Sequence, residues 1–336
     1  MKDIELPRKV LVGDGAINRV KEVVSELNLK KASLIIADSN TEKIAGKFVA
    51  DQLDSDIYIL KNSCVGEINK CLDSIKKKKI KYLAGVGGGT IIDFTKICAF
   101  KSKIPFLSIP SAASHDGITS PQATLKGDKP TSIRVHSPMG IIADTEIIRK
   151  APKNLLAAGC ADAISNYTAI LDWKLAYKEI NEYYGDYAAS LSMMSAKIVM
   201  DNAEKIKEDV SILVEALISS GVAIGIAGSS RPCSGAEHLF SHALDLIVKK
   251  PALHGEQCGV GCIMMAYLHR AEWTKVKNSL KKVGAPTTSR ELGIDEKHII
   301  RALTIAHTIR DRYTILRDGL TEHEAIELAK ATGVIK

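Results

Sequence analysis

The chain has 336 residues, of which 46% are hydrophobic and 25% are charged. This length is enough for two domains of ordinary size, and the composition is typical of a globular protein, which excludes a disordered or fibrous chain. The net charge of +7 is mild and suits an anionic ligand. No aromatic residues interleave the one dense basic run, Lys76–Lys79, so nucleic acid is not an expected partner.

The seven cysteines are scattered along the chain and form no C-x-x-C pair. An odd number of unpaired cysteines favours reduced thiols in a cytoplasmic protein over a disulfide framework. The N-terminus, MKDIELPRK, lacks the apolar core of a signal peptide. There is no run of about eighteen apolar residues, so we expect no membrane insertion.

The first half of the chain alternates strand and helix patterns. A strand–helix pair spans residues 6–24, with a turn at Gly13–Gly15. Further strand patterns cover residues 31–37, 56–60, 81–86 and 105–110, and helix patterns cover residues 41–53, 67–78 and 90–100. This alternation predicts a Rossmann-like α/β domain in which helices cover a parallel sheet. Residues 125–140, rich in Gly and Pro, predict a β-hairpin.

The pattern changes near Lys150, and from there only helical periods are found. They cover residues 155–171, 186–203, 210–227, 236–248 and 258–271. The last helix is predicted to start at Thr321, because Thr321 and Glu324 have the spacing of a capping box. We therefore predict two domains, a nucleotide-binding α/β domain at residues 1–150 and an all-helical, metal-binding domain at residues 151–336.

A glycine triplet, Gly87–Gly89, follows the apolar run of one predicted strand, and a helix pattern opens at Thr90. Glycines allow the backbone to approach a ligand closely, and the free N–H groups of a helix start favour a pyrophosphate. The triplet does not have the G-x-G-x-x-G spacing. A plain turn between strand and helix explains it equally well when it is taken alone.

Three histidines gather in a short stretch of the helical half. His238 and His242 are four residues apart and share a helix face, while His254 follows Pro251, where a helix boundary is expected. Two helix segments can therefore direct imidazoles at one point, with Asp162 available upstream as a third ligand. A merely polar helix face fits the spacing equally well. A metalloprotease H-E-x-x-H motif does not fit, because Leu239 follows His238.

Together these segments resemble one known superfamily. GGGTIIDFTK, IPSAASHDGITSP, GCADAISNY and SGAEHLFSHALD…ALHGE occur in the order seen in the iron-containing alcohol dehydrogenase, glycerol dehydrogenase and dehydroquinate synthase superfamily. The resemblance spans about Leu11 to His254 and implies the dehydroquinate synthase-like fold. Within the superfamily, SHDGITSP and SSRPCSGAEH look most like archaeal sn-glycerol-1-phosphate dehydrogenases, which use NADH or NADPH to reduce dihydroxyacetone phosphate for membrane phospholipids.

The resemblance implies roles for individual residues. Asp162, His238 and His254 would bind one metal ion per subunit, and Asn166, where iron enzymes carry a further histidine, favours zinc. His242 would contact the substrate and relay a proton, and Asp116 resembles the family's ligand for a substrate hydroxyl, although an Asx turn explains it equally well. Asp162 would also contact the substrate, and Arg231 is the candidate for its phosphate group.

The resemblance also implies a cofactor site. Its pyrophosphate would lie on the glycine triplet and Thr90, and Asp38, at the end of a strand, would bind a ribose hydroxyl. Further cofactor contacts would come from Asp93, Ser111, Ser114 and Ser120. The residues after Asp38 could instead accommodate a phosphate, so the choice between NAD and NADP stays open. A homo-oligomer is expected, with the active site in a cleft between the two domains.

Three classes of function remain. The leading one is the oxidoreductase, with a glycerol dehydrogenase acting on an unphosphorylated polyol as its close alternative. The second is a metal-dependent lyase like dehydroquinate synthase, whose substrate pocket is richer in Lys and Arg than the segments around Asp116 and Arg231. The third is a non-catalytic metal-binding protein, which would leave the glycine triplet unexplained.

Overall fold

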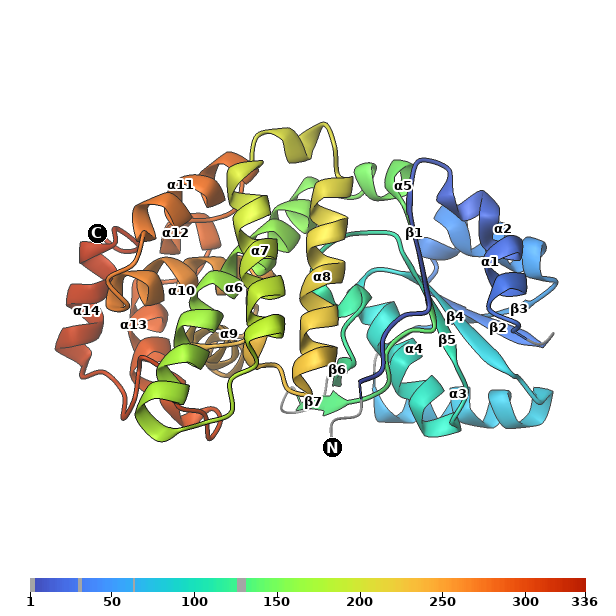
Figure 1. Ribbon diagram of the computed structural model, residues 1–336, viewed down its shortest axis with the longest axis horizontal. Coiled ribbons are helices and arrows are strands. Elements are labelled where there is room, and N and C mark those ends of the chain that lie inside the picture. The colour runs from blue at the N-terminus through green and yellow to red at the C-terminus, as the bar shows by residue number, and fades with distance from the viewer. Residues whose placement is uncertain (1–3, 30–31, 63, 126–130) are drawn as a thin grey trace. The chain divides into compact units, whose positions relative to one another are not determined.

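The computed structural model describes residues 4–29, 32–62, 64–125 and 131–336 (Figure 1). The chain divides into two compact units, Met1–Pro152 and Lys153–Lys336. All strands belong to the first unit, and the second is helical throughout its regular elements. The predicted fold class, an α/β domain followed by an all-helical domain, is confirmed.

The first unit contains a six-stranded parallel sheet with the strand order β1-β8-β5-β4-β2-β3. Its strands are β1 (Lys9–Gly13), β2 (Ser33–Ala37), β3 (Asp56–Ile59), β4 (Tyr82–Gly87), β5 (Phe106–Pro110) and β8 (Gly140–Asp144). Strands β2, β4, β5 and β8 are buried along their whole length. Such continuous burial requires layers on both faces, which explains why their sequences are apolar rather than alternating.

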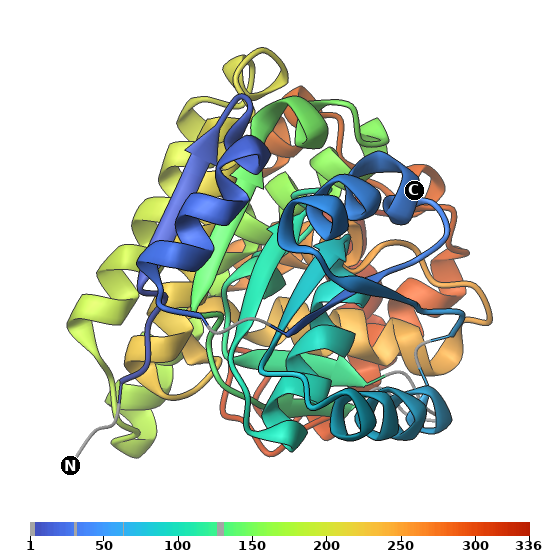
Figure 2. The same ribbon diagram turned by 90° about the vertical axis from the view of Figure 1, so that its right-hand side faces the viewer.

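Helices cover both faces of this sheet (Figures 1 and 2). Those of one face are η1 (Ala16–Arg19), α1 (Val20–Glu26), η2 (Glu42–Gly46) and α2 (Lys47–Leu53); those of the other are α3 (Val65–Lys78) and α4 (Gly89–Ser102). Strand β4 shows the alternation, since Ala84 and Val86 pack with α1 and α2 while Leu83 packs with α3 and α4. The unit ends with α5 (Thr145–Arg149).

The predicted hairpin exists, but it starts earlier than the sequence pattern indicates. Strands β6 (Gln122–Leu125) and β7 (Thr131–Arg134) pair antiparallel, and residues 126–130 lie outside the described part of the chain. Strand β8, just beyond the predicted hairpin, was not anticipated. A hairpin rather than a helix precedes it in sequence, so the strand–helix alternation that marks the other strands is missing there.

The second unit is built around one long helix, α6 (Lys153–Ile180), which packs against α7, α8, α9 and α10. The remaining helices are α7 (Asp186–Asp201), η4 (Lys205–Lys207), α8 (Ser211–Ala227), η5 (Arg231–Cys233), α9 (Ala236–Ile247), α10 (His254–Leu268), α11 (Trp273–Val283), α12 (Ser289–Leu292), α13 (Glu296–Ile305), η6 (Ala306–Thr308) and α14 (Glu322–Ala331). Helices α11, α12 and α13 fall where no separate helix was predicted. Thr321 and Glu324 form the predicted capping box of α14.

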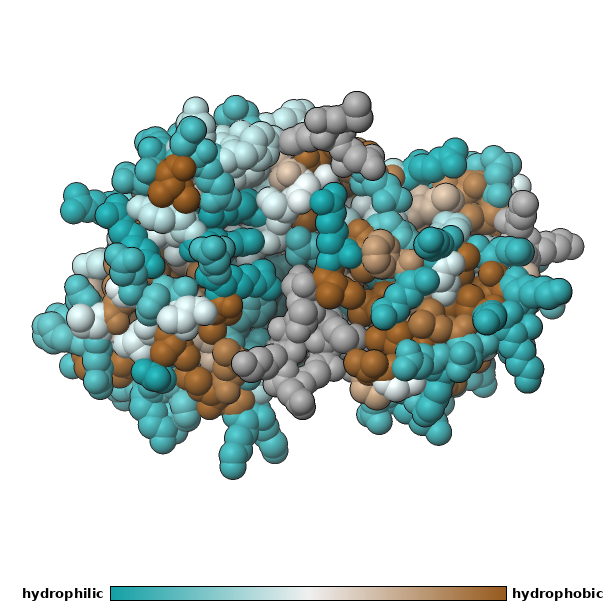
Figure 3. Space-filling view, turned by 90° about the horizontal axis from the view of Figure 1, so that it is seen from below, coloured by the Kyte–Doolittle hydropathy of each residue, from teal (hydrophilic) through white to brown (hydrophobic). Residues whose placement is uncertain are grey.

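None of the seven cysteines, all of which lie in the described part of the chain, forms a disulfide, and every one except Cys64 is buried. Hydrophilic side chains project over much of the face in Figure 3, with hydrophobic patches between them. Within the described ranges, no helix combines the length and the apolar character that crossing a membrane needs.

Candidate metal and cofactor sites

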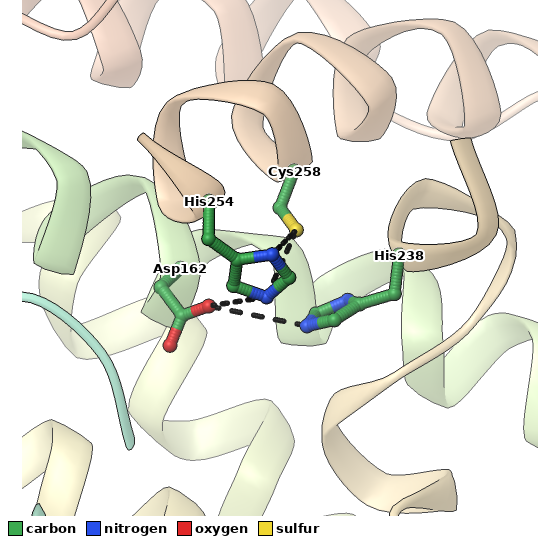
Figure 4. Close-up of side chains that lie close together, drawn as sticks. All are labelled: Asp162, His238, His254 and Cys258. Atoms are coloured by element: carbon green, nitrogen blue, oxygen red, sulfur yellow. Dashed lines mark hydrogen bonds and ion pairs between the residues drawn. The ribbon is translucent and has the colours of Figure 1, made fainter. Parts of the chain in front are cut away.

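Three helices of the second unit bring one carboxylate and two imidazoles together (Figure 4). Asp162 lies on α6, His238 on the first turn of α9, and His254 is the first residue of α10. The Oδ1 atom of Asp162 is 3.9 Å from Nε2 of His238 and 3.9 Å from Nε2 of His254. The two imidazole rings have centroids 5.0 Å apart. The residues predicted as metal ligands therefore point their donor atoms at a common point.

A fourth donor, Cys258, lies at the same point, although its place in an apolar stretch of α10 did not single it out in the sequence. It stands one turn after His254, and its Sγ is 3.6 Å from Nε2 of His254. Donor atoms of Asp162, His238, His254 and Cys258 all lie within 4.8 Å of one another. Burial, and then the charges of Asp162 and Glu237, raise the pKa of the Cys258 thiol well above its usual value, so the side chain is protonated here.

The start of α10 reaches α6 because residue 255 is glycine. A Cβ atom at Gly255 would lie 2.0 Å from the carbonyl oxygen of Ala158, so any side chain would force the two helices apart. Ala158 is one turn before Asp162 on the same face of α6. This close approach is what brings His254 next to Asp162.

The buried carboxylate of Glu237 orients His238 through Nδ1, the ring nitrogen that does not face Asp162. Glu237 is fully buried, and its Oε1 lies 2.9 Å from Nδ1 of His238 and accepts the backbone N–H of Gly235 at 2.6 Å. Its Oε2 accepts the Thr168 hydroxyl at 2.8 Å. Burial alone would raise the pKa of Glu237, but the His238 imidazole and these donors outweigh it and lower the pKa. A proton held on Nδ1 leaves the lone pair of Nε2 facing Asp162.

His254 and His242 have partners of their own. The Ser241 hydroxyl lies 3.1 Å from Nδ1 of His254 and accepts the amide of Gln257 at 3.2 Å. The ring of His242 stacks on that of His254 with centroids 5.6 Å apart, and its Nδ1 is 3.7 Å from Oδ2 of Asp245. Burial lowers the pKa of His242 against the opposing effect of Asp245, which favours a neutral imidazole. Sequence reasoning did not single out Asp245, whose three-residue spacing from His242 was the available signal.

Two other predicted positions are engaged elsewhere in the helical unit. Asn166 is buried and donates from its amide to the hydroxyl of Ser220 on α8 at 2.8 Å. Arg231 is buried on η5, forms a bidentate ion pair with Glu182 and donates to the carbonyl of Tyr313 at 2.8 Å. Both side chains thus make contacts that hold the helical unit together.

In the first unit, the three glycines of the triplet have different surroundings. A Cβ at Gly87 would lie 2.7 Å from the side chain of Ile91, and one at Gly89 would lie 1.9 Å from Nε2 of His115. A Cβ at Gly88 would meet no protein atom within 4 Å. Gly88 is the N-cap of α4, and Thr90 is exposed on its first turn. Packing thus requires two of the glycines, while the third leaves the helix start open to a ligand.

The loop after β5 lies against this triplet. The backbone N–H of Ser111 donates to the carbonyl of Gly87 at 3.0 Å, and Nδ1 of His115 accepts the N–H of Gly117 at 2.8 Å. Asp116 begins the short helix η3 (Asp116–Ile118), Ser114 is half-buried, and Ser120 is buried. Asp116 belongs to the first unit, whereas the histidine cluster belongs to the second.

Asp38 and Asp93 have partners in the first unit. Oδ1 of Asp38 accepts the backbone N–H groups of Asn40 and Thr41 at 2.9 and 2.8 Å, which caps the helical segment after β2. Asp93 is buried and pairs with the fully buried Lys96 at 3.2 Å, and its second oxygen accepts the N–H of Thr124 on β6. Asp93 therefore fastens the hairpin to α4.

Comparisons with known proteins agree with this architecture. Residues 11–152 match the iron-containing alcohol dehydrogenase family. The solved structure of a probable glycerol dehydrogenase from Sinorhizobium meliloti 1021 superposes with a TM-score of 0.83 at 20% identity, covering 100% of both chains. The chain therefore has the fold of the iron-containing alcohol dehydrogenase class.

Curated relatives identify the family within this class. Glycerol-1-phosphate dehydrogenase (NAD(P)+) from Pyrococcus furiosus is 53% identical, covering 100% of this chain and 100% of its own length. The enzyme of the same name from Methanosarcina mazei is 50% identical over 99% of this chain and 97% of its own. The chain belongs to the glycerol-1-phosphate dehydrogenase family.

Proposed function

We propose that this chain reduces dihydroxyacetone phosphate to sn-glycerol 1-phosphate with NADH or NADPH, at a divalent metal ion held by Asp162, His238 and His254. The observation that carries the proposal is the convergence of these three donors in a chain that is 53% identical over its full length to a glycerol-1-phosphate dehydrogenase. The product would supply the glycerophosphate backbone of archaeal membrane phospholipids.

The donor set suits a divalent ion. Tetrahedral ligands about 2.1 Å from an ion lie about 3.4 Å from one another. The separations of 3.9 Å between Asp162 and each imidazole are wider by roughly half an ångström, which small side-chain rotations remove. Asp162 and the buried Glu237 together carry two formal negative charges next to two imidazoles, which matches the charge of a dication.

Zinc is the metal that we propose. One carboxylate and two imidazoles beside a thiol form a donor set of the kind zinc accepts, and three protein ligands leave a coordination position open, as in catalytic zinc sites. Asn166, where iron enzymes of the superfamily carry a further histidine, donates to Ser220 and adds no imidazole to the cluster. Metal analysis of the purified protein, followed by reconstitution with zinc or ferrous iron, tests this choice.

The cofactor and the metal supply the reactive chemistry. The nicotinamide provides the hydride, and a bound metal ion stabilises the negative charge that develops on the ketone oxygen. The chain's own residues bind and orient. Gly88 leaves the N-terminus of α4 accessible to the pyrophosphate, and Ser111, Ser114 and Ser120 line the loop beside it. Asp93 acts indirectly on the cofactor site, because it holds the hairpin of β6 and β7 against α4.

Proton transfer is assigned to His242. Its imidazole is favoured in the neutral form, stacks on the ligand His254 and lies next to Asp245, which can stabilise a proton on the ring. Asp116 is proposed to bind a substrate hydroxyl, in line with the resemblance of SHDGITSP to the family motif.

The decisive experiment measures oxidation of the reduced nicotinamide with dihydroxyacetone phosphate and with dihydroxyacetone. We expect the phosphorylated ketone to be far the better substrate, and enantiomer-specific analysis to identify sn-glycerol 1-phosphate as the product. Equal rates with both ketones would favour a glycerol dehydrogenase. No oxidation with either ketone would leave the lyase as the remaining enzymatic alternative.

A further inference from the structure

Three arginines gather where the chain's last loop meets the start of α9. Arg231 lies on η5, directly before α9, and Arg310 and Arg312 lie in the segment between η6 and α14. Arg312 donates to the hydroxyl of Ser230 at 2.8 Å and also to the carbonyl of Ser234.

The segment between η6 and α14 is also attached to α9 through a buried carboxylate. The backbone N–H of Ile315 donates to Oδ1 of the buried Asp172 at 2.7 Å. Asp172 also accepts the N–H of Ala236, the first residue of α9, so the segment is fixed against the helix that carries His238 and His242.

Two of the three guanidinium groups are satisfied inside the protein and one is not. Arg231 is neutralised by its bidentate pair with Glu182, and Arg312 is bonded to Ser230 and Ser234. Arg310 is half-buried, yet across the described ranges it makes no hydrogen bond or ion pair. A guanidinium that is partly covered by protein and has no protein acceptor is left to water or to an anionic ligand, and an anion would stabilise its charge.

The segment that carries Arg310 lies against the helix that carries the histidines. Helix α9 packs against η6 and α13, and Arg310 follows the last residue of η6 by two positions. Arg310 therefore lies close to α9, on which His238 and His242 are one helical turn apart.

We infer that Arg310 is the anion subsite of the proposed active site and binds the phosphate of the substrate through its guanidinium. The inference rests on the proposed function and replaces Arg231, whose charge Glu182 already neutralises, as the phosphate ligand. A planar guanidinium pairs with two phosphate oxygens at once, which fixes orientation as well as supplying attraction. A phosphate held there keeps the ketone carbon at one place relative to the metal ligands and His242.

The test compares Arg310→Ala and Arg310→Gln with wild type on dihydroxyacetone phosphate and on dihydroxyacetone. We expect the ratio of kcat/KM for the phosphorylated over the unphosphorylated ketone to fall about 10- to 100-fold, the loss expected for a charged hydrogen bond. Arg301→Ala, which removes an exposed arginine from α13 of the same unit, is the matched control and should keep the wild-type ratio. Circular dichroism checks that each variant folds, and the Gln variant preserves side-chain length.

A second measurement does not depend on turnover. Inorganic phosphate titrated calorimetrically into the demetallated protein should bind to wild type and to Arg301→Ala, and should bind at least tenfold more weakly to both Arg310 variants. If wild type shows no preference for the phosphorylated ketone, the proposed function fails. If wild type shows that preference and the Arg310 variants keep both it and phosphate binding, the assignment of Arg310 is overturned while the proposed function stands.

Discussion

Gly88 differs from its two neighbours because nothing in the protein occupies the place of its missing side chain. We expect Gly88→Val to weaken nicotinamide cofactor binding by at least tenfold, since a side chain at the N-cap of α4 would keep a pyrophosphate away from the free N–H groups. Its backbone is extended, with φ −75°, so the substitution causes no strain there. Titration of cofactor fluorescence measures the effect.

The neighbouring glycine provides the contrast. Gly89→Ala should lower the stability of the fold itself, because its Cβ would collide with His115. Chemical unfolding of both variants measures the free energy of unfolding, which should fall in Gly89→Ala and stay close to wild type in Gly88→Val. Unchanged cofactor affinity in Gly88→Val would show that the triplet serves only as a turn.

Asp38 bears on the choice of cofactor. We expect Asp38→Ala to shift the preference toward NADPH, because removal of a carboxylate beside the adenosine ribose removes repulsion of a 2′-phosphate. Asp38 also accepts two backbone N–H groups, so the variant should lose about 1 kcal/mol of stability as well. The NADPH to NADH ratio of kcat/KM is the measurement, and an unchanged ratio would place the ribose elsewhere.

At Glu237, the effect of the negative charge on zinc affinity can be measured separately from the effect of its hydrogen bonds. In Glu237→Gln, the remaining oxygen can still accept from Gly235 and His238, and the new amide can donate to Thr168. Only the negative charge is lost. We therefore expect zinc affinity to fall about 10- to 100-fold, as for other residues that hydrogen-bond to metal ligands. Competition with a chromophoric chelator measures the affinity without reference to activity.

A matched control exists in α12. Glu291 also accepts a backbone N–H and a threonine hydroxyl, both from Thr287, at 2.8 and 3.0 Å. Glu291→Gln should leave zinc affinity unchanged. Equal affinity in the two variants would assign Glu237 to the fold alone.

At the scale of helices, the metal cluster depends on how closely α10 approaches α6. Gly255→Ala would place a methyl group 2.0 Å from the carbonyl of Ala158, and we expect a loss of about 1–3 kcal/mol together with weaker zinc binding. Unfolding in urea and chelator competition report the two effects. Gly66→Ala serves as the control, because its Cβ would meet only Cys64 Sγ at 3.9 Å. Full zinc affinity in Gly255→Ala would show that the helices do not need this contact.

The elements that the sequence predicted well are those whose signals are local. The strands β2, β4 and β5 end in apolar runs, and the capping box of α14 needs only residues three apart. Strand β8 was missed because a hairpin rather than a helix precedes it, so the local strand–helix alternation that marks the other strands is absent there.

The same distinction holds for the candidate site. Spacing indicated His238, His242 and His254, the upstream segment offered Asp162 as a further ligand, and the resemblance implied their roles. Cys258 was missed because an apolar helix pattern hides which side chain faces a cluster. Arg310 was missed because its significance lies in having no partner among the described residues, and only the three-dimensional fold reveals which arginines are paired.

For the molecule as a whole, the proposed metal ion should contribute to both activity and stability. Demetallated protein should be inactive, and zinc should restore turnover. Because the ion would bind only the folded ligand cluster, zinc at about a thousandfold excess over its Kd should add about 4 kcal/mol to the free energy of unfolding. Thermal unfolding with and without chelator measures this, and full turnover by carefully demetallated protein would contradict the mechanism.

The thiol of Cys258 makes the proposed centre vulnerable to the wrong ion. With zinc on one carboxylate and two imidazoles, a protonated thiol 3.6 Å from His254 leaves the fourth position to the substrate. A thiophilic ion such as cadmium gains more from sulfur and would recruit Cys258 as well. Four protein ligands would then enclose the ion, as in a structural site. Binding of a soft metal would thus remove the coordination position that the substrate needs. The ion would then only link α6, α9 and α10, and the protein would be inactive.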